Sequence, residues 1–93
     1  MSKFGEIVER GKVLIASVEE GKTYPEFSER DLAIDLTHKP YKVVKIEKEK
    51  NEELMVALGI HFYPSVNYYQ DSHLVESFRF GECTNKFILG KLL

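Results

Sequence analysis

The pattern of apolar and polar positions predicts an alternation of short helices and strands. Residues 3–10 carry Phe4, Ile7 and Val8 at helical spacing among charged residues, which is typical of a short amphipathic helix ending at Gly11. Short runs rich in β-branched and aromatic residues, bounded by polar turns, predict strands. These predicted strands are residues 13–18, 41–47, 66–69 and 74–80. The first run is continuously apolar, which favours a strand buried on both faces.

A helix is expected at about residues 24–36, after the first predicted strand. Thr23 is a candidate N-cap, and Pro25 is tolerated in a first helical turn. Phe27 and Ile34 would then lie on the inner face together with Tyr24. The C-terminal part of this segment also alternates apolar and polar residues, so a strand remains an alternative there.

The segment from Asn51 to Gly59 carries the clearest helix signals in the chain. Asn51 is a favoured N-cap, and Glu52 and Glu53 fall in the first turn, where the helix dipole favours carboxylates. Gly59 is placed for a left-handed C-cap, with Ile60 packing back on the helix. We therefore expect a helix that begins and ends at these residues.

The last third of the chain predicts a hairpin followed by a helix. Residues 70–73, a polar Gln-Asp-Ser-His link, join the two final strands. Thr84 or Cys83 would cap a last helix that turns Phe87, Ile88 and Leu92 inward. The expected order is α-β-α-β-α-β-β-α, an α/β fold with a small mixed four-stranded sheet flanked by helices on both faces.

Composition limits the classes of function. The chain has 93 residues, which predicts one domain over residues 1–93. Its net charge of −2 argues against a nucleic-acid partner or an anionic membrane surface. No apolar run approaches the ~18 residues of a membrane span, and no apolar signal peptide opens the sequence. With Cys83 as the single cysteine, we expect no internal disulfide and a cytoplasmic protein.

The stretch from Gly59 to Ser65 places Pro64 directly before a predicted strand. Proline cannot donate to a strand ladder, so Pro64 should open the strand rather than occupy its middle. An X–Pro bond is also where a cis peptide can occur.

These residues resemble a motif of the thioredoxin superfamily. The family carries Gly-[Ile/Val]-x-x-x-Pro-Thr, with a cis proline, where this chain has Gly59-Ile60 followed by Tyr63-Pro64-Ser65. Gly81 after the last strand and the end of the strand at residues 45–47 are similar too. The resemblance covers nearly the whole chain and implies a thioredoxin-like fold with a cis Pro64.

The chain departs from the family at its catalytic motif. The resemblance implies a Cys-x-x-Cys pair where Gly21 and Tyr24 stand, and no cysteine precedes Cys83. Dithiol exchange needs one thiol to attack and a second to resolve the mixed disulfide. We therefore predict a redox-inactive, thioredoxin-like protein without a cofactor, and expect no dithiol oxidoreductase activity.

The resemblance also implies a binding groove made by three loops, in which an extended segment of a protein partner pairs with the residue before the proline. Its candidate residues are Gly21, Lys22, Thr23, Tyr24, Phe62, Tyr63, Pro64, Phe80 and Gly81. The alternative is that Phe62 and Phe80 are core residues and the proline serves folding only. The identity of the partner and the oligomeric state are not readable from the sequence.

Cys83 supports an alternative function as a monothiol redox or glutathione-linked protein. A position just before the last helix could lower its thiol pKa, whereas a packed cysteine would be inert. Asp31 and Asp35 form an i, i+4 carboxylate pair that fits a solvated face better than acid–base chemistry. We expect no metal site.

The positions of the three histidines argue against a metal site, because they fall in three separate links and no two have the sequence spacing of metal ligands on one element. They are His38, His61 and His73.

Overall fold

The computed structural model describes residues 11–93, apart from the side chain of Phe80. The helix expected at residues 3–10 lies outside the described residues. The strands are β1 (Lys12–Val18), β2 (Tyr41–Glu47), β3 (Ser65–Gln70) and β4 (His73–Phe78). The helices are α2 (Glu29–Asp35), α3 (Glu52–Ala57) and α4 (Asn85–Leu92), with 3₁₀ turns η1 (Lys48–Lys50) and η2 (Phe80–Glu82).

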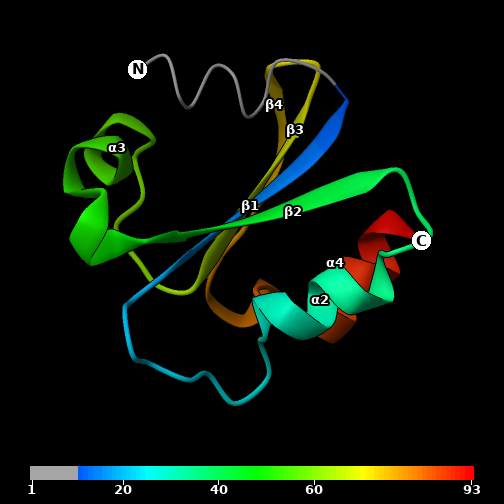
Figure 1. Cartoon of the computed structure of the whole chain (residues 1–93), viewed down its shortest axis with the longest axis horizontal. Helices are drawn as coiled ribbons and strands as arrows, with labels where there is room; N and C mark the ends of the chain where they lie inside the picture. Colours follow the sequence, from blue (N-terminus) through cyan, green and yellow to red (C-terminus); the bar gives the residue numbers. More distant parts are fainter. Residues whose placement is uncertain (1–10) are drawn as a thin grey trace.

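Strand β1 lies inside a four-stranded sheet with the order β2-β1-β3-β4 (Figure 1). It pairs in parallel with β2 and antiparallel with β3, and β3 pairs antiparallel with β4. Residues 13–18 of β1 are all buried, which explains why this run is apolar without alternation. The order and type of the described elements agree with the sequence prediction.

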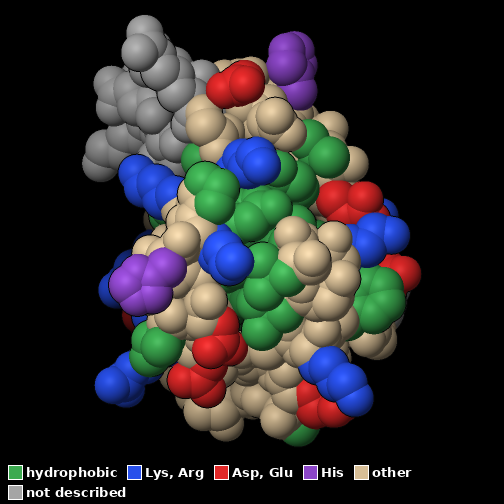
Figure 2. Space-filling model, turned by 90° about the vertical axis from the view of Figure 1, so that its right-hand side faces the viewer, with side chains coloured by type: hydrophobic (Ala, Val, Ile, Leu, Met, Phe, Trp, Pro, Cys, Tyr) green, Lys and Arg blue, Asp and Glu red, His purple; other side chains and the backbone are tan. Residues whose placement is uncertain are grey.

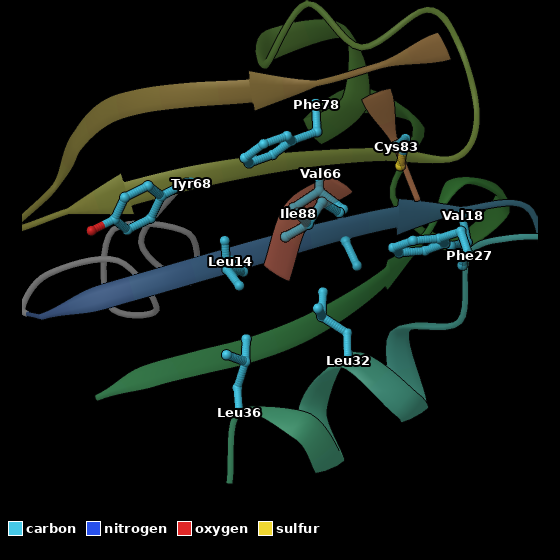
Figure 3. Packing of buried hydrophobic residues seen from close by; sticks show 11 residues of the cluster. Leu14, Val18, Phe27, Leu32, Leu36, Val66, Tyr68, Phe78, Cys83 and Ile88 are labelled. Atoms are coloured by element: carbon cyan, nitrogen blue, oxygen red, sulfur yellow. The ribbon is translucent and has the colours of Figure 1, made fainter. Parts of the chain in front are cut away.

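Helices cover both faces of the sheet (Figure 1). On one face, side chains from α2 and α4 pack with Leu14, Val66 and Phe78 of the sheet (Figure 3). On the other face, Met55 of α3 packs with Val13, Ile15, Ile46 and Tyr69. Successive β1 residues therefore serve opposite cores, as the period of two along a strand requires. The mixed sheet with flanking helices is confirmed.

Helix α2 begins at Glu29, five residues later than the sequence predicts. Its N-cap is Ser28 and not Thr23, because the Ser28 hydroxyl accepts a hydrogen bond from the Asp31 N–H (3.2 Å). The buried pair is Leu32 and Leu36 at i, i+4 spacing, and Ile34 is 59% exposed. The expected inward position of Ile34 is therefore wrong, and the strand alternative is excluded.

Asn85 of α4 explains the late start of α2. The Ser28 N–H donates to Asn85 Oδ1 (2.9 Å), and Asn85 Nδ2 donates to the Ser28 carbonyl (3.0 Å). These two bonds tie the beginnings of α2 and α4 together. The choice between the two possible caps thus depends on a residue more than fifty positions away.

Helix α3 ends as predicted. Gly59 has a φ of +71°, and the Ile60 N–H donates to the Met55 carbonyl (2.9 Å), the bond of a Schellman C-cap. Ile60 is buried against the helix. Asn51 occupies the N-cap position but makes no capping bond; its Nδ2 donates to the Glu47 carbonyl (3.0 Å) instead.

The hairpin turn is shorter than the predicted link. Asp71 and Ser72 alone form it, both with positive φ (50° and 74°), so β3 and β4 extend to Gln70 and His73. The last strand ends at Phe78, and the 3₁₀ turn η2 follows.

Helix α4 is capped by Thr84, whose Oγ1 accepts from the Phe87 N–H (3.1 Å). Its inward residue is Ile88, which is fully buried, whereas Phe87 is 41% exposed. The prediction that Phe87 faces inward is therefore wrong, because its aromatic side chain is partly exposed at the surface.

Candidate functional site

Three loops meet at one end of the sheet, and together they line a hollow of about 200 Å³. They meet there because β1 and β4 end where the antiparallel β3 begins. The three loops contribute Tyr24 before α2, Pro64 before β3 and Gly81 after β4. The remaining lining residues are Pro25, Glu26, Phe27, Cys83 and Thr84. We call this site the proline hollow.

Pro64 stands at the entrance to β3, and the Tyr63–Pro64 peptide bond is cis. The first strand pair of β3 joins Ser65 to Ser17, so the proline itself takes no place in the ladder. The Ser65 hydroxyl donates to the Phe62 carbonyl and closes the loop around the proline. The sequence prediction that Pro64 precedes the strand is confirmed.

Tyr63 precedes Pro64 directly, but neither it nor Phe62 is among the lining residues of the proline hollow. Among the described residues, its N–H and C=O form no hydrogen bond. Its ring lies on the α3 side of the sheet, where it packs with the core and Lys48 Nζ sits 5.4 Å from the ring centroid. Burial, followed by the negative charge of nearby glutamates, raises the pKa of the Tyr63 hydroxyl.

Phe62 is 49% exposed, so the interpretation of this residue as a core aromatic is wrong. It lies one residue before Tyr63, at the outer edge of the proline loop. For Phe80 the same question stays open, because its side chain lies outside the described residues. Gly81, its neighbour, does line the proline hollow.

The loop at residues 19–24 is held by charged groups. The Glu19 carboxylate pairs with Lys22 (3.5 Å) and Lys48 (3.9 Å), while Lys50 lies between Glu20 (3.4 Å) and Glu47. The Glu19 N–H also donates to the Tyr24 hydroxyl (2.9 Å). These contacts fasten the loop to η1.

Of the four site residues predicted in this loop, only Tyr24 reaches the proline hollow. Gly21, Lys22 and Thr23 line a separate hollow of about 230 Å³ beside Glu29, Lys45 and Glu47. Tyr24 and Phe27 line both hollows. The residues of the predicted groove are therefore distributed over two neighbouring hollows.

Comparison with known proteins shows which solved structures share this architecture. No protein-family model and no curated protein matches the sequence. A cysteine-to-serine mutant thioredoxin of Entamoeba histolytica superposes with a TM-score of 0.79 at 13% identity, over 98% of this chain and 89% of that one. The oxidised thioredoxin of Plasmodium falciparum gives 0.76 at 13% identity, over 99% and 88%.

A mutant thioredoxin of Halobacterium salinarum gives a TM-score of 0.73 at 15% identity, over 99% of this chain and 80% of that one. The chain has the thioredoxin fold. At these identities the likeness concerns the fold, and the fold expected from the residues around Pro64 is confirmed.

Within this thioredoxin fold, the single cysteine is enclosed by the core. Cys83 is 3% exposed and belongs to the cluster of Phe27, Phe78 and Ile88 (Figure 3). Burial raises the pKa of its thiol to about 12. The lowered pKa that the monothiol alternative requires is therefore contradicted, because desolvation disfavours the thiolate.

The sequence did not point to four residues of the proline hollow as site residues. Pro25, Glu26 and Phe27 belong to a segment that was expected to be helical, and Thr84 was considered only as a cap. All four residues lie next to the end of a loop. Their part in the hollow can be recognised only once the three loops have come together in the fold.

Other candidate chemistry finds no support in the described part of the thioredoxin fold. Within residues 11–93, no three potential ligand side chains lie close enough to hold a metal ion. Asp31 and Asp35 are both exposed on α2. None of the described helices has the length and apolar character needed to cross a bilayer.

Proposed function

We propose that this chain binds an extended segment of another protein at the proline hollow and does not catalyse dithiol exchange. The observation that carries the proposal is that the backbone N–H and C=O of Tyr63 form no hydrogen bond with the described residues, next to Pro64 in a hollow lined by three loops. A partner strand that pairs with this residue would satisfy both groups, as in recognition by strand addition. The hollow would then receive one of its side chains.

The aromatic residues around the hollow support the same function. Tyr24 is partly buried and lines the hollow beside Pro64, and the half-exposed Phe62 belongs to the loop of Pro64 itself. Aromatic side chains provide large contact area at low entropic cost and often dominate binding energies. Nothing in the described fold covers the ring of Phe62 fully.

The thiol chemistry supports the redox-inactive part of the proposal. A dithiol cycle requires a second thiol to resolve the mixed disulfide, and Cys83 is the only cysteine. Its burial and raised pKa oppose attack on a disulfide even once. A lone buried thiol also fits a reducing compartment such as the cytoplasm.

Peptide selection followed by titration tests the binding site. A random peptide library is selected on the wild-type protein, and the most enriched peptide is titrated by fluorescence anisotropy. At Gly81 an added Cβ would meet no atom within 4 Å and needs no left-handed backbone, and Gly81 lines the hollow, so the side chain of Gly81→Leu should extend into it. We expect at least about tenfold weaker binding.

Ala33→Leu is the matched control, because it adds the same side chain at an exposed position on α2. It should bind as wild type does. Equal affinity of Gly81→Leu and the control would place binding elsewhere and overturn the proposal. Thiol-dependent insulin reduction accelerated by the wild-type protein would overturn its redox-inactive part.

A further inference from the structure

A second hollow continues from the proline hollow along the surface of α4. Its volume is about 600 Å³, and it shares Glu26, Gly81 and Thr84 with the proline hollow. The remaining lining residues are Lys86, Phe87, Gly90 and Lys91 of α4. We call this extension the α4 groove. A segment that leaves the proline hollow past Gly81 enters it directly.

The floor of the α4 groove is apolar and fixed. Phe87 packs edge-on against the buried Phe78, with ring centroids 6.1 Å apart, yet remains 41% exposed. One helical turn further, Gly90 has no side chain, and a Cβ there would meet nothing within 4 Å. The missing side chain leaves the space beside the Phe87 ring open.

Two ammonium groups without carboxylate partners border this floor. Lys86 and Lys91 are exposed, and among the described residues neither forms an ion pair, whereas Lys22, Lys45, Lys48 and Lys50 each do. At i, i+4 spacing, Lys86 neighbours Gly90 and Phe87 neighbours Lys91, so all four share one helix face.

The surface around α4 has the same character. Figure 2 looks onto the side of the molecule that carries α4 and the C-terminus, and shows a band of hydrophobic side chains with Lys and Arg side chains beside it. Among the described residues, Glu26 is the one acidic side chain that lines the α4 groove, and it also lines the proline hollow. A complementary partner segment would therefore carry an apolar side chain at the proline hollow and an acidic side chain at the α4 groove.

We propose that the α4 groove selects partner segments in which an acidic side chain follows the apolar anchor held in the proline hollow. This inference rests on the proposed function, because it assumes that a peptide segment occupies the proline hollow. The acidic side chain pairs with Lys86 or Lys91, and an adjacent apolar side chain lies on Phe87. Surface pairs of this kind contribute modestly to affinity and more to selectivity.

The test uses a random peptide library on wild-type protein and on the charge-reversed variant Lys86→Glu/Lys91→Glu. We expect wild type to enrich peptides with Asp or Glu beside an apolar residue, and the variant to retain the apolar preference but lose or invert the acidic one. The best wild-type peptide should bind the variant about tenfold more weakly. Its affinity for wild type should also fall between about 0.05 M and about 0.5 M salt.

Lys39→Glu/Lys42→Glu is the matched control, with the same change in net charge at exposed lysines that also lack ion pairs in the described part of the chain. It should keep the wild-type preference. An acidic preference that is absent from wild type, or that survives in Lys86→Glu/Lys91→Glu, overturns the inference while leaving the proposed function standing. If no peptide is enriched on wild type, both are overturned.

A steric variant tests whether a peptide occupies the α4 groove, independently of the charges of Lys86 and Lys91. At Gly90 an added Cβ would meet nothing within 4 Å, and Gly90→Leu replaces glycine by a better helix former, so its side chain should occupy the α4 groove and its thermal stability should hold or rise. We expect it to weaken the selected acidic peptide while leaving a short peptide that contains only the apolar anchor unaffected. Unchanged binding of the acidic peptide would contradict occupation of the α4 groove.

Discussion

Two serines that face each other across the sheet illustrate how differently one residue type can act. Ser17 and Ser65 are paired on β1 and β3, and both are buried. The Ser65 hydroxyl donates to the Phe62 carbonyl, whereas the Ser17 hydroxyl has no hydrogen-bond partner among the described residues. A buried hydroxyl without a partner loses its hydration and gains nothing in return.

We therefore predict opposite effects of the same substitution at these two positions. Ser17→Ala should raise the free energy of unfolding by about 1 kcal/mol, and Ser65→Ala should lower it by about the same amount. Urea denaturation of the three proteins measures both changes, and each should shift Tm by several degrees in a domain of this size. Destabilisation by Ser17→Ala would mean that its hydroxyl has a partner.

Cys83 shows how far enclosure determines thiol chemistry. Its side chain sits in an apolar cluster and the pKa of the thiol is about 12, so the thiolate is scarce at neutral pH. We predict that an aromatic disulfide reagent labels the native protein slowly at pH 7.5, and that labelling accelerates by orders of magnitude in guanidinium. Fast labelling of the native state, compared with the unreactive Cys83→Ala variant, would contradict this burial.

At the scale of elements, the start of α2 was predicted less well than the strands. Strands could be found because their signal is local: residues 13–18 are a short apolar run, and residues 41–47 are rich in β-branched residues. The start of α2 could not, since Thr23 and Ser28 are both acceptable caps. The contacts of Ser28 with Asn85 decide between them, and these exist only after α4 has docked.

The difference between a residue that caps a helix, Thr84, and one that was only predicted to do so, Thr23, can be measured. Thr84→Ala removes the capping bond to the Phe87 N–H and should lower the free energy of unfolding of the protein by about 1 kcal/mol. Thr23→Ala should change it by less than about 0.5 kcal/mol, because Thr23 is exposed and caps no helix. Chemical denaturation compares the two directly, and similar losses at both positions would show that Thr23 stabilises its loop in another way.

At the scale of the whole molecule, the sequence was enough for the architecture and for the meeting of three loops, but not for the shape of the site. Tyr24, Pro64 and Gly81 come together as expected. The distribution of the predicted groove residues over two hollows, and the exposure of Phe87, depend on which side chains the assembled core has room for. Such competition for buried volume leaves no local trace in the sequence.

Several buried acids make the whole fold sensitive to alkali. Burial raises the pKa of Cys83 from its ordinary value of 9.0 to about 12, and it also raises the hydroxyl pKa of Tyr68 and Tyr69. Above pH 9 the unfolded chain therefore loses protons that the folded chain retains. We predict that the free energy of unfolding falls as the pH rises from 9, by up to about 1.4 kcal/mol per pH unit from Cys83.

Urea titrations at a series of pH values test this, with Cys83→Ala as the reference. The variant should be less stable at neutral pH, because it leaves a cavity, but its stability should fall less steeply between pH 9 and pH 10. Equal slopes for the two proteins would remove Cys83 as the cause.

Because α2 starts late, restoring two cysteine side chains would not be enough to make this chain an oxidoreductase. Gly21 has a left-handed backbone, and Tyr24 stands well ahead of Ser28, where the helix and its polarising amides begin. In Gly21→Cys/Tyr24→Cys, neither thiol would lie at a helix start, so both should keep the ordinary pKa of a free thiol and fail to reduce insulin efficiently. Two point mutations would restore the two cysteines of the motif but not the helix start that lowers the pKa of a thiol.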